Sequence, residues 1–445
     1  NSRKNGHVLS CSICREEPVS ILIKGGRIID PSQGIDGKGN VLIENGKIKS
    51  YPKTTKKYEN DLDVKVIDAK GNIVSPGLVD IHVHLREPGF EHKETIRTGC
   101  ESAAAGGFTS IVCMPNTNPV NDNASVTEYI LLKARTEGIV NVFPIGAITK
   151  GELGETLAQI GEMYQAGCVG VSDDGMPVMN SKVMRHAMEY VQAFDIPVLS
   201  HAEDKDLSGS GVMNEGEVST QLGLVGIPCA SEDVMVSRDI TVAELTGSRL
   251  HICHVSTAGS VRLIRAAKKR GVKVTAEVTP HHFILTDEAV GRYDTNAKMN
   301  PPLRGKKDRE AVIEGLKDGT LDAIATDHAP HSEDEKKVEF DLAPFGIVGL
   351  ETALPLSLKL VEDGALTINQ MISKLTNSPS DVLNLGKGTL KIGDDADVVI
   401  FDPEQEITID RESFHSKSKN SPFDGWKLKG KVNYTIVNGE IVYSG

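Results

Sequence analysis

The sequence predicts an α/β protein: a (β/α)8 TIM barrel with a small β-sandwich domain formed from both chain ends. Three observations support this. Short apolar strands alternate with helical stretches through the middle of the chain, both ends carry short β segments instead, and 445 residues leave room for a full barrel. The expected limits are 77–387 for the barrel and 19–76 with 388–445 for the small domain.

The central region contains eight candidate strands, each a short apolar run. They are LVDIHVH from Leu78, FTSIVCMP from Phe108, NVFPIGAI from Asn141, CVGVSD from Cys168, PVLSHA from Pro197, RLHICHVS from Arg249, KVTAEVTP from Lys273 and DAIATDHA from Asp322. Helical stretches such as KETIRTGCESAAAG, SVTEYILLKARTEG and SVRLIRAAKKRG lie between strands and close on Gly, as a C-cap would. Long segments follow the fifth and seventh strands, and in a barrel these are loops on the catalytic face.

The two chain ends resemble each other in texture. Asn-Gly pairs at Asn45-Gly46 and Asn438-Gly439 predict tight hairpin turns, so both ends are expected to pair into one β domain. Residues 1–18 are polar and are predicted to be a flexible tail. We interpret the C-x-x-C of Cys11 and Cys14 as part of that tail, because no second Cys pair follows at zinc-ribbon spacing.

Composition excludes several classes of function. A net charge of −13 argues against general binding to nucleic acid or anionic membranes, and 4% aromatic residues disfavour recognition of single strands by stacking. Seven scattered Cys residues indicate a reducing compartment, which predicts a cytoplasmic protein. We see no apolar run of about 18 residues and therefore expect no membrane span.

Histidines and aspartates follow the predicted strands at the positions where a barrel keeps its chemistry. His82 and His84 form an H-x-H, and alternation along a strand points both imidazoles to one side. Four further strand ends carry N or O ligand types. These are Asp174, His201, His254 and Asp327.

Because a barrel brings its strand ends together, these six side chains predict one metal centre. The ligand types favour Zn²⁺ over Mn²⁺ or Co²⁺, which stay open. Six ligands exceed the four of a closed tetrahedral site, so we expect one or two Zn²⁺ per subunit and favour two that share a carboxylate.

The remaining histidines are expected to have structural roles. His251 is predicted to face away from His254 on its strand, and His281 and His282 are placed on a loop. His331 differs, because four residues past Asp327 it could reach a substrate at the barrel mouth. Lys150 is expected in a solvated loop.

Several strings together carry a family resemblance: SPGLVDIHVHLREPG, MPNT, SDDG, SHAED, CHVST, EVTPHH, KMNPPLRG and ATDHAPH, in this order. The chain resembles the dihydroorotases of the bacterial type I group, in the cyclic amidohydrolase superfamily, from about Ile21 to Tyr443. The resemblance assigns His82, His84 and Asp327 to one metal and His201 and His254 to a second, with Asp174 as the bridge.

The resemblance implies reversible cyclisation of N-carbamoyl-L-aspartate to L-dihydroorotate, a step of de novo pyrimidine (UMP) biosynthesis. A metal-activated hydroxide would attack the ring amide, and Asp327 would act as general base and then acid. Arg86 offers a bidentate fork for the substrate carboxylate, and Asn116 and His331 complete that site by family match. Asn300 and the Phe345-Gly346 backbone would contact the ring.

Two alternatives remain. One is a hydantoinase, dihydropyrimidinase or allantoinase, which usually carry a bridging Lys and lack the Arg of HLREPG. The other is a non-catalytic barrel scaffold, although such proteins typically lose ligands that this chain keeps. The resemblance also implies a homodimer and, in some bacteria, association with aspartate transcarbamoylase.

Overall fold

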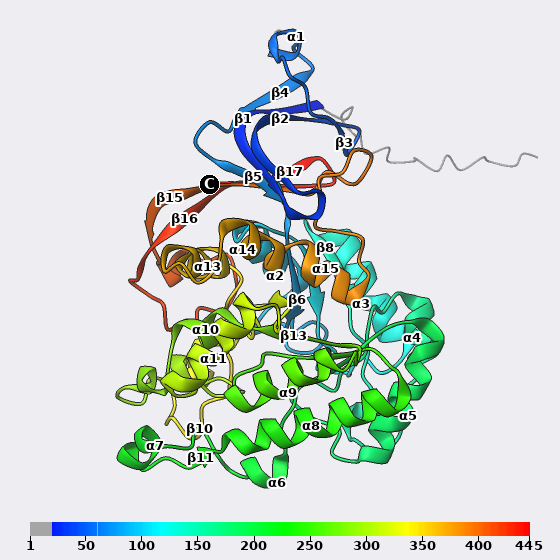
Figure 1. Cartoon of the computed structure of the whole chain (residues 1–445), viewed down its shortest axis with the longest axis vertical. Coiled ribbons are helices and arrows are strands. Elements are labelled where there is room, and N and C mark those ends of the chain that lie inside the picture. The colour runs from blue at the N-terminus through cyan, green and yellow to red at the C-terminus, as the bar shows by residue number, and fades with distance from the viewer. Residues whose placement is uncertain (1–19, 60) are drawn as a thin grey trace, which may run out of the picture.

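The fold is described from a computed structural model, which covers residues 20–59 and 61–445. The predicted tail of residues 1–18, with Cys11 and Cys14, lies outside the described residues. Within them, no helix is both long enough and apolar enough to cross a membrane. The predicted fold class is confirmed: a parallel α/β barrel carries a small β domain to which both chain ends contribute (Figure 1).

Parallel strands form the barrel wall in chain order. They are β6 (Leu78–Val83), β7 (Phe108–Cys113), β8 (Asn141–Pro144), β9 (Val198–Ser200), β12 (Leu250–Ile252), β13 (Val274–Val278) and β14 (Ala323–Ile324). The predicted fourth strand is reduced to Val171, which bridges to Gly146 and to Val198. The barrel closes where Val83 pairs with His328, and the His84 N–H donates to the His328 carbonyl at 2.8 Å.

Helices cover the outside of this wall, as alternation of strands and helices requires (Figure 1). The longer ones are α2 (Ile96–Ala105), α3 (Ala124–Glu137), α5 (Ser181–Val191), α8 (Cys229–Thr246), α9 (Ala258–Lys269), α11 (Lys306–Lys317), α13 (Ala353–Glu362) and α14 (Ile368–Leu375); α4 (Ile160–Ala166) and α15 (Asn377–Leu383) are shorter.

Two of the predicted C-cap glycines end their helices for a different reason than expected. Gly106 and Gly138 have φ of −78° and −77°, so neither uses the left-handed conformation. A Cβ at Gly106 would lie 2.1 Å from the Leu350 carbonyl oxygen, and one at Gly138 would lie 2.6 Å from that of Ala134. Close packing against backbone therefore selects glycine at both positions. The third predicted glycine is confirmed: Gly271 follows the Arg270 cap of α9 with φ of 83°, and its N–H donates to the Lys268 carbonyl at 3.0 Å.

The small domain is one eight-stranded mixed sheet in the order β17-β16-β15-β5-β1-β2-β3, with β4 also paired to β1. Its strands are β1 (Ser20–Asp30), β2 (Ile35–Glu44), β3 (Lys47–Ser50), β4 (Val64–Asp68), β5 (Ile73–Pro76), β15 (Val398–Thr408), β16 (Lys427–Val437) and β17 (Glu440–Ser444). Antiparallel pairing of β15 with β5 joins the two chain ends, as predicted. Asn45 and Asn438 each have positive φ before a positive-φ glycine, which is the geometry expected of Asn-Gly hairpin turns.

The two long loops become walls above the barrel mouth. The loop after β9 contains α6 (Lys205–Ser208), β10 (Met213–Asn214), α7 (Glu217–Leu222) and β11 (Gly226–Ile227), at the end of the molecule opposite the small domain (Figure 1). The buried Arg304, from the loop after β13, donates to Asn214 Oδ1 at 3.2 Å and to the Ile227 carbonyl at 2.7 Å. This arginine ties the two loops together.

A buried carboxylate joins three segments near the closure of the barrel. Glu94 Oε2 lies 3.3 Å from His328 Nε2, and both side chains are fully buried. Glu94 also accepts hydrogen bonds from the Ser416 hydroxyl and, at 3.1 Å, from the Lys417 backbone N–H. The loop after β6, the end of the eighth strand and the C-terminal segment therefore share one anchor.

We predict that Glu94→Ala lowers the free energy of unfolding by about 3 kcal/mol, because it leaves buried His328 without its charged partner. Urea denaturation of the full chain measures this. The same change at Glu128, an exposed residue of α3, is the control and should cost far less. Equal losses for the two variants would show that Glu94 is not an anchor.

Candidate active site and metal centre

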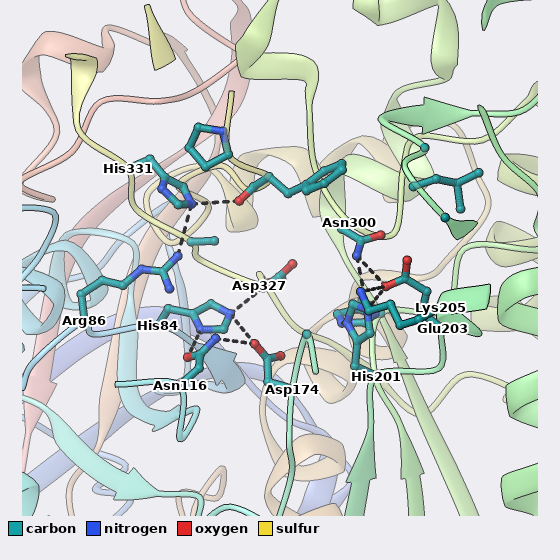
Figure 2. Close-up of a pocket in the computed structure, with 18 residues that line it drawn as sticks. His84, Arg86, Asn116, Asp174, His201, Glu203, Lys205, Asn300, Asp327 and His331 are labelled. Carbon is teal, nitrogen blue, oxygen red and sulfur yellow. Dashed lines mark hydrogen bonds and ion pairs between the residues drawn. The ribbon is translucent and has the colours of Figure 1, made fainter. Parts of the chain in front are cut away.

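A cavity of about 440 Å³ opens at the carboxyl ends of the barrel strands (Figure 2). Its lining is polar and contains both signs of charge. It includes His84, Arg86, Asn116, Asp174, His201, Glu203, Lys205, His254, Asn300, Asp327, His331 and Phe345. Arg86 and His331 lie on one side of this cavity, and Glu203, Lys205 and Asn300 lie on the other.

His84 and Asp327 line the cavity, and His82 lies fully buried against them. His82 is the fifth residue of β6 and His84 follows its end, so both imidazoles reach the same side. Asp327 Oδ1 lies 3.0 Å from His84 Nε2 and 3.6 Å from His82 Nε2. One potential ligand atom from each of the three residues lies within 4.8 Å of the others, which suits a single metal ion.

A second group of ligand atoms adjoins the first. His82, Asp174 and His254 also offer atoms within 4.8 Å of one another, and His201 Nδ1 lies 3.0 Å from His254 Nε2. Asp174 Oδ1 is 3.3 Å from His82 Nε2, while its Oδ2 is 3.8 Å from His84 Nε2. The Asp174 carboxylate thus lies between the two groups, where a shared ligand would have to be.

The donor set fits a divalent cation. His254 Nδ1 is buried without a hydrogen-bond partner among the described residues, an arrangement that is costly unless something else occupies the site. Burial and the neighbouring His201 and His82 lower the pKa of His254, which keeps its ring neutral as metal ligation requires. Burial alone would raise the pKa of Asp174, but His84, His82 and His201 outweigh burial and hold it well below its usual range.

A third group, formed by His82, Cys253 and Glu277, is a poorer candidate. Burial, with the nearby Glu277 charge, raises the pKa of the Cys253 thiol to about 12. A thiol must lose its proton to bind a metal ion, so Cys253 is not part of the proposed ligand set.

Unusual backbone conformations aim the site residues. Arg86, Asp174, His254 and Asp327 have φ of 60°, 37°, 33° and 49°. Non-glycine residues seldom adopt this left-handed conformation, because it strains the backbone. Residues strained in this way cluster at functional sites, where the surrounding structure holds them in place. The chain therefore turns sharply just after β6, β12 and the eighth strand, and just after Val171, which stands in place of the fourth strand.

The residues expected at the substrate end divide into two groups. Arg86 and His331 are neighbours, with Arg86 Nη2 3.4 Å from His331 Nε2, and Phe345 lines the same cavity through a carbonyl 2.8 Å from that nitrogen. Burial and the cations of Arg86, Lys336 and Lys93 lower the pKa of His331, so its ring is neutral at neutral pH.

Asn116, Asn300 and Gly346 are already hydrogen-bonded within the protein. Asn116 Oδ1 accepts from His84 Nδ1 at 2.9 Å, and Asn116 Nδ2 donates to Asp174 Oδ2 at 2.6 Å. Asn300 donates to Glu203 at 2.9 Å. The Gly346 N–H donates to the Lys298 carbonyl at 2.9 Å, and Gly346 is not among the residues that line the cavity.

Sequence reasoning missed two carboxylates that contact the candidate metal ligands. Glu203 Oε2 lies 3.2 Å from His201 Nε2 and 2.5 Å from Lys205 Nζ. Burial opposes ionisation of Glu203, but His201 and Lys205 hold its pKa well below the usual range. Glu277 lies 2.7 Å from His82 Nδ1. The available signals were a Glu two residues after His201 and a Glu inside an otherwise apolar strand.

The prediction for His251 was wrong. His251 lies inside the barrel, fully buried, with Nε2 3.1 Å from Glu277 Oε2. Strand alternation fails as a guide because His254 lies two residues beyond β12 and has positive φ. His281 and His282 are in a short helix, α10 (Pro280–Ile284), rather than a loop, and His282 Nε2 lies 3.0 Å from the Pro301 carbonyl. Lys150 is exposed, as expected.

Solved structures with the same architecture are amidohydrolases in the broad sense. An L-hydantoinase (dihydropyrimidinase) from Arthrobacter aurescens superimposes with a TM-score of 0.84 at 26% identity, over 95% of this chain and 96% of that one. A dihydropyrimidinase from Brevibacillus agri NCHU1002 gives 0.83 at 23% identity, over 96% of this chain and 95% of that one, which shows the shared fold alone.

Sequence comparison is more specific. A family model described as Dihydro-orotase-like matches residues 71–260, and one described as Amidohydrolase family matches 341–443. Dihydroorotases from Geobacter sp. (strain M21) and Geobacter metallireducens are each 58% identical over 425 residues, 96% of this chain and 99% and 100% of theirs. The dihydroorotase of Syntrophus aciditrophicus is 55% identical over 96% of this chain and 99% of its own. With such identity along nearly its whole length, the chain belongs to the dihydroorotase family.

Proposed function

We propose that the chain is an active dihydroorotase that interconverts N-carbamoyl-L-aspartate and L-dihydroorotate in pyrimidine biosynthesis. The observation that carries this proposal is the meeting of His82, His84 and Asp327 beside a cavity whose wall holds Arg86. Members of its family at 58% identity bear the name dihydroorotase. A scaffold that had lost activity would have no need to retain this donor set.

The proposed cofactor is Zn²⁺, with two ions favoured. His82, His84 and Asp327 would hold one, and His201 and His254 would hold the other, with Asp174 shared. A bound divalent ion makes water more acidic and polarises an amide carbonyl. Imidazole nitrogens and carboxylate oxygens are the ligand types that zinc accepts in hydrolytic sites.

Asp327 is the proposed proton carrier. Its carboxylate lines the cavity and touches His84, so it faces both the metal ligands and the bound substrate. In the hydrolytic direction it takes the proton of the attacking water and passes it to the ring nitrogen as the amide bond breaks. In the biosynthetic direction the same carboxylate takes the proton from the carbamoyl nitrogen as the ring closes and passes it to the carboxyl oxygen, which leaves as water.

Arg86 and neutral His331 are proposed to bind the substrate carboxylate. Arg86 Nε donates to the Pro330 carbonyl at 3.2 Å and Nη2 lies 3.4 Å from His331 Nε2, which together hold the guanidinium at the cavity wall. A guanidinium pairs with a carboxylate through two parallel hydrogen bonds. Because Asn116, Asn300 and Gly346 are bonded elsewhere, their proposed substrate contacts require an exchange of partners; Phe345 contributes its carbonyl and ring.

The hydantoinase and dihydropyrimidinase alternative is the weaker one. Asp174 occupies the position between the two ligand groups, and Lys150, which follows β8, is exposed. Hydantoin and dihydrouracil also lack the ring carboxylate that Arg86 is placed to bind. A homodimer, association with aspartate transcarbamoylase and a cytoplasmic location belong to the proposal on the family resemblance alone.

Metal removal should reduce dihydroorotate hydrolysis to the background rate, because Asp327 alone offers no group that polarises the ring carbonyl. The measurement is turnover of chelator-treated, dialysed protein, with metal content determined in parallel. Zn²⁺ should restore activity. Full turnover by demonstrably metal-free protein would contradict the proposal, as would activity on hydantoin or dihydrouracil that exceeds activity on dihydroorotate.

Asp327→Asn should lower kcat by about 10²- to 10⁴-fold in both directions, because an amide cannot accept the proton. Its oxygen can still contact a metal ion, so metal content should largely persist. Asp322→Asn is the matched control, since Asp322 lies at the opposite end of the same strand, paired with Lys268. A normal kcat in Asp327→Asn would contradict the proposed role of Asp327 as proton carrier.

Arg86→Ala should raise KM for dihydroorotate and lower kcat/KM by roughly thirtyfold, equivalent to about 2 kcal/mol for a lost charged partner. Arg97→Ala provides the control, because Arg97 is an exposed cation of the nearby helix α2 with a distant partner, Glu137. Steady-state kinetics decide the matter. Unchanged KM and kcat in the Arg86 variant would refute its contact with the carboxylate.

A further inference from the structure

Below the cavity floor, a buried carboxylate is held between two imidazoles. Glu277 of β13 is fully buried, with Oε1 2.7 Å from His82 Nδ1 and Oε2 3.1 Å from His251 Nε2. It does not line the cavity. The two oxygens of one side chain therefore connect β6 with β12 through the barrel interior.

The far end of this connection is also fixed. His251 Nδ1 lies 2.9 Å from the Thr275 hydroxyl, and Thr275 precedes Glu277 by two residues on the same face of β13. His251 and Thr275 are direct partners in the β12–β13 ladder. A continuous chain thus runs from Thr275 through His251 and Glu277 to His82.

We infer that Glu277, held by His251, is a positioning residue that fixes the ring orientation and tautomer of His82. This inference rests on the proposed metal-dependent function. An ionised carboxylate only accepts hydrogen bonds, so Nδ1 of His82 must carry a proton, and Nε2 is the ring nitrogen that remains for a metal ion. That Nε2 is the atom 3.3 Å from Asp174 and 3.6 Å from Asp327, where a metal ion would bind.

The other candidate ligands have different supports. His84 Nδ1 is 2.9 Å from the neutral amide oxygen of Asn116. His201 Nε2 contacts Glu203, which lines the cavity and shares its charge with Lys205. Among the described residues, Glu277 has no lysine or arginine within ion-pairing distance; its oxygens contact the two imidazoles and, at 3.4 Å, the His254 backbone N–H. Of the three contacts to candidate ligand histidines, the Glu277–His82 hydrogen bond is the shortest, at 2.7 Å.

Burying a carboxylate without a formal cation is costly, and an apolar residue would fill the same space at lower cost. Hydrogen bonds to two imidazoles offset part of that cost. What an apolar side chain could not supply is an acceptor for the Nδ1 proton of His82. Acceptors of this kind orient metal-binding imidazoles and raise their basicity.

The decisive experiment compares metal binding by the wild-type chain and Glu277→Gln. Metal-free protein is titrated with Zn²⁺ against a competing chromophoric chelator, and the absorption spectrum of the Co²⁺-loaded protein reports ligand geometry. Glu277→Gln keeps the shape but cannot accept from both imidazoles. We expect its Zn²⁺ affinity to fall roughly 10- to 100-fold and its Co²⁺ spectrum to change. At saturating metal, kcat should fall with KM unchanged, because Glu277 does not contact the cavity.

Two further variants separate positioning from mere stability. Asp30→Asn removes a fully buried carboxylate of β1 that holds Gln33 and the Leu390 N–H, far from the barrel mouth. It should cost stability while leaving Zn²⁺ affinity and the Co²⁺ spectrum as in the wild type. His251→Phe retains Glu277 but removes its support, and should weaken Zn²⁺ binding by a smaller factor in the same direction.

The outcomes distinguish this inference from the proposed function. A wild-type chain that binds no Zn²⁺ and shows no turnover overturns the proposed function itself. A wild-type chain that binds Zn²⁺, with Glu277→Gln equal to it in affinity and Co²⁺ spectrum, overturns the positioning role alone. Should Glu277→Gln fail to fold, His251→Phe decides, because wild-type affinity and spectrum in that variant would equally contradict the inference.

Discussion

Closure of the barrel is the constraint on which the site depends. Val83 pairs with His328, and this contact brings the first strand against the eighth. Without it, His84 and Asp327, 243 residues apart in the chain, would not lie 3.0 Å from each other. The buried hydrogen bond between Glu94 and His328 stabilises the same junction.

Electrostatics explain how an acidic protein can handle an anionic substrate. The net charge is −13, yet the cavity gathers Arg86 and Lys205 with a set of histidines, and Lys93 and Lys336 stand behind His331. Most carboxylates of the site lie against imidazoles or Lys205. Arg86 lines this cavity, so local positive charge there does not require the whole surface to be basic.

Much of the architecture could be predicted from the alternation of short apolar runs with helical stretches along the sequence. Seven of the eight predicted strands exist, and the Asn-Gly hairpins and the pairing of the chain ends follow from local turn chemistry. The fourth strand shrinks to Val171, because pairing at that position depends on neighbours that the local sequence does not reveal. The local sequence likewise does not reveal why glycine is needed at positions 106 and 138. A side chain at Gly106 or Gly138 would collide with a backbone carbonyl, and neither residue uses the left-handed conformation.

Site residues that directly follow a strand could be predicted from the sequence, whereas those inside a strand could not. His82, His84, Asp174, His201, His254 and Asp327 all gather at the barrel mouth, since strand ends converge there. Glu277 and His251 escaped because a buried charge inside a strand has meaning only once its partners across the barrel are known. Glu277 and His251 place hydrogen-bonding groups beneath the candidate metal ligands, which apolar barrel packing would not supply.

The most direct test of the central claim is X-ray diffraction from Zn²⁺-loaded crystals, with anomalous data collected at the zinc edge. The account predicts an anomalous peak between His82, His84 and Asp327, with Asp174 beside it and a second peak near His201 and His254 if two ions bind. Loaded crystals with no anomalous peak among these residues, or with peaks only elsewhere on the protein, would contradict it.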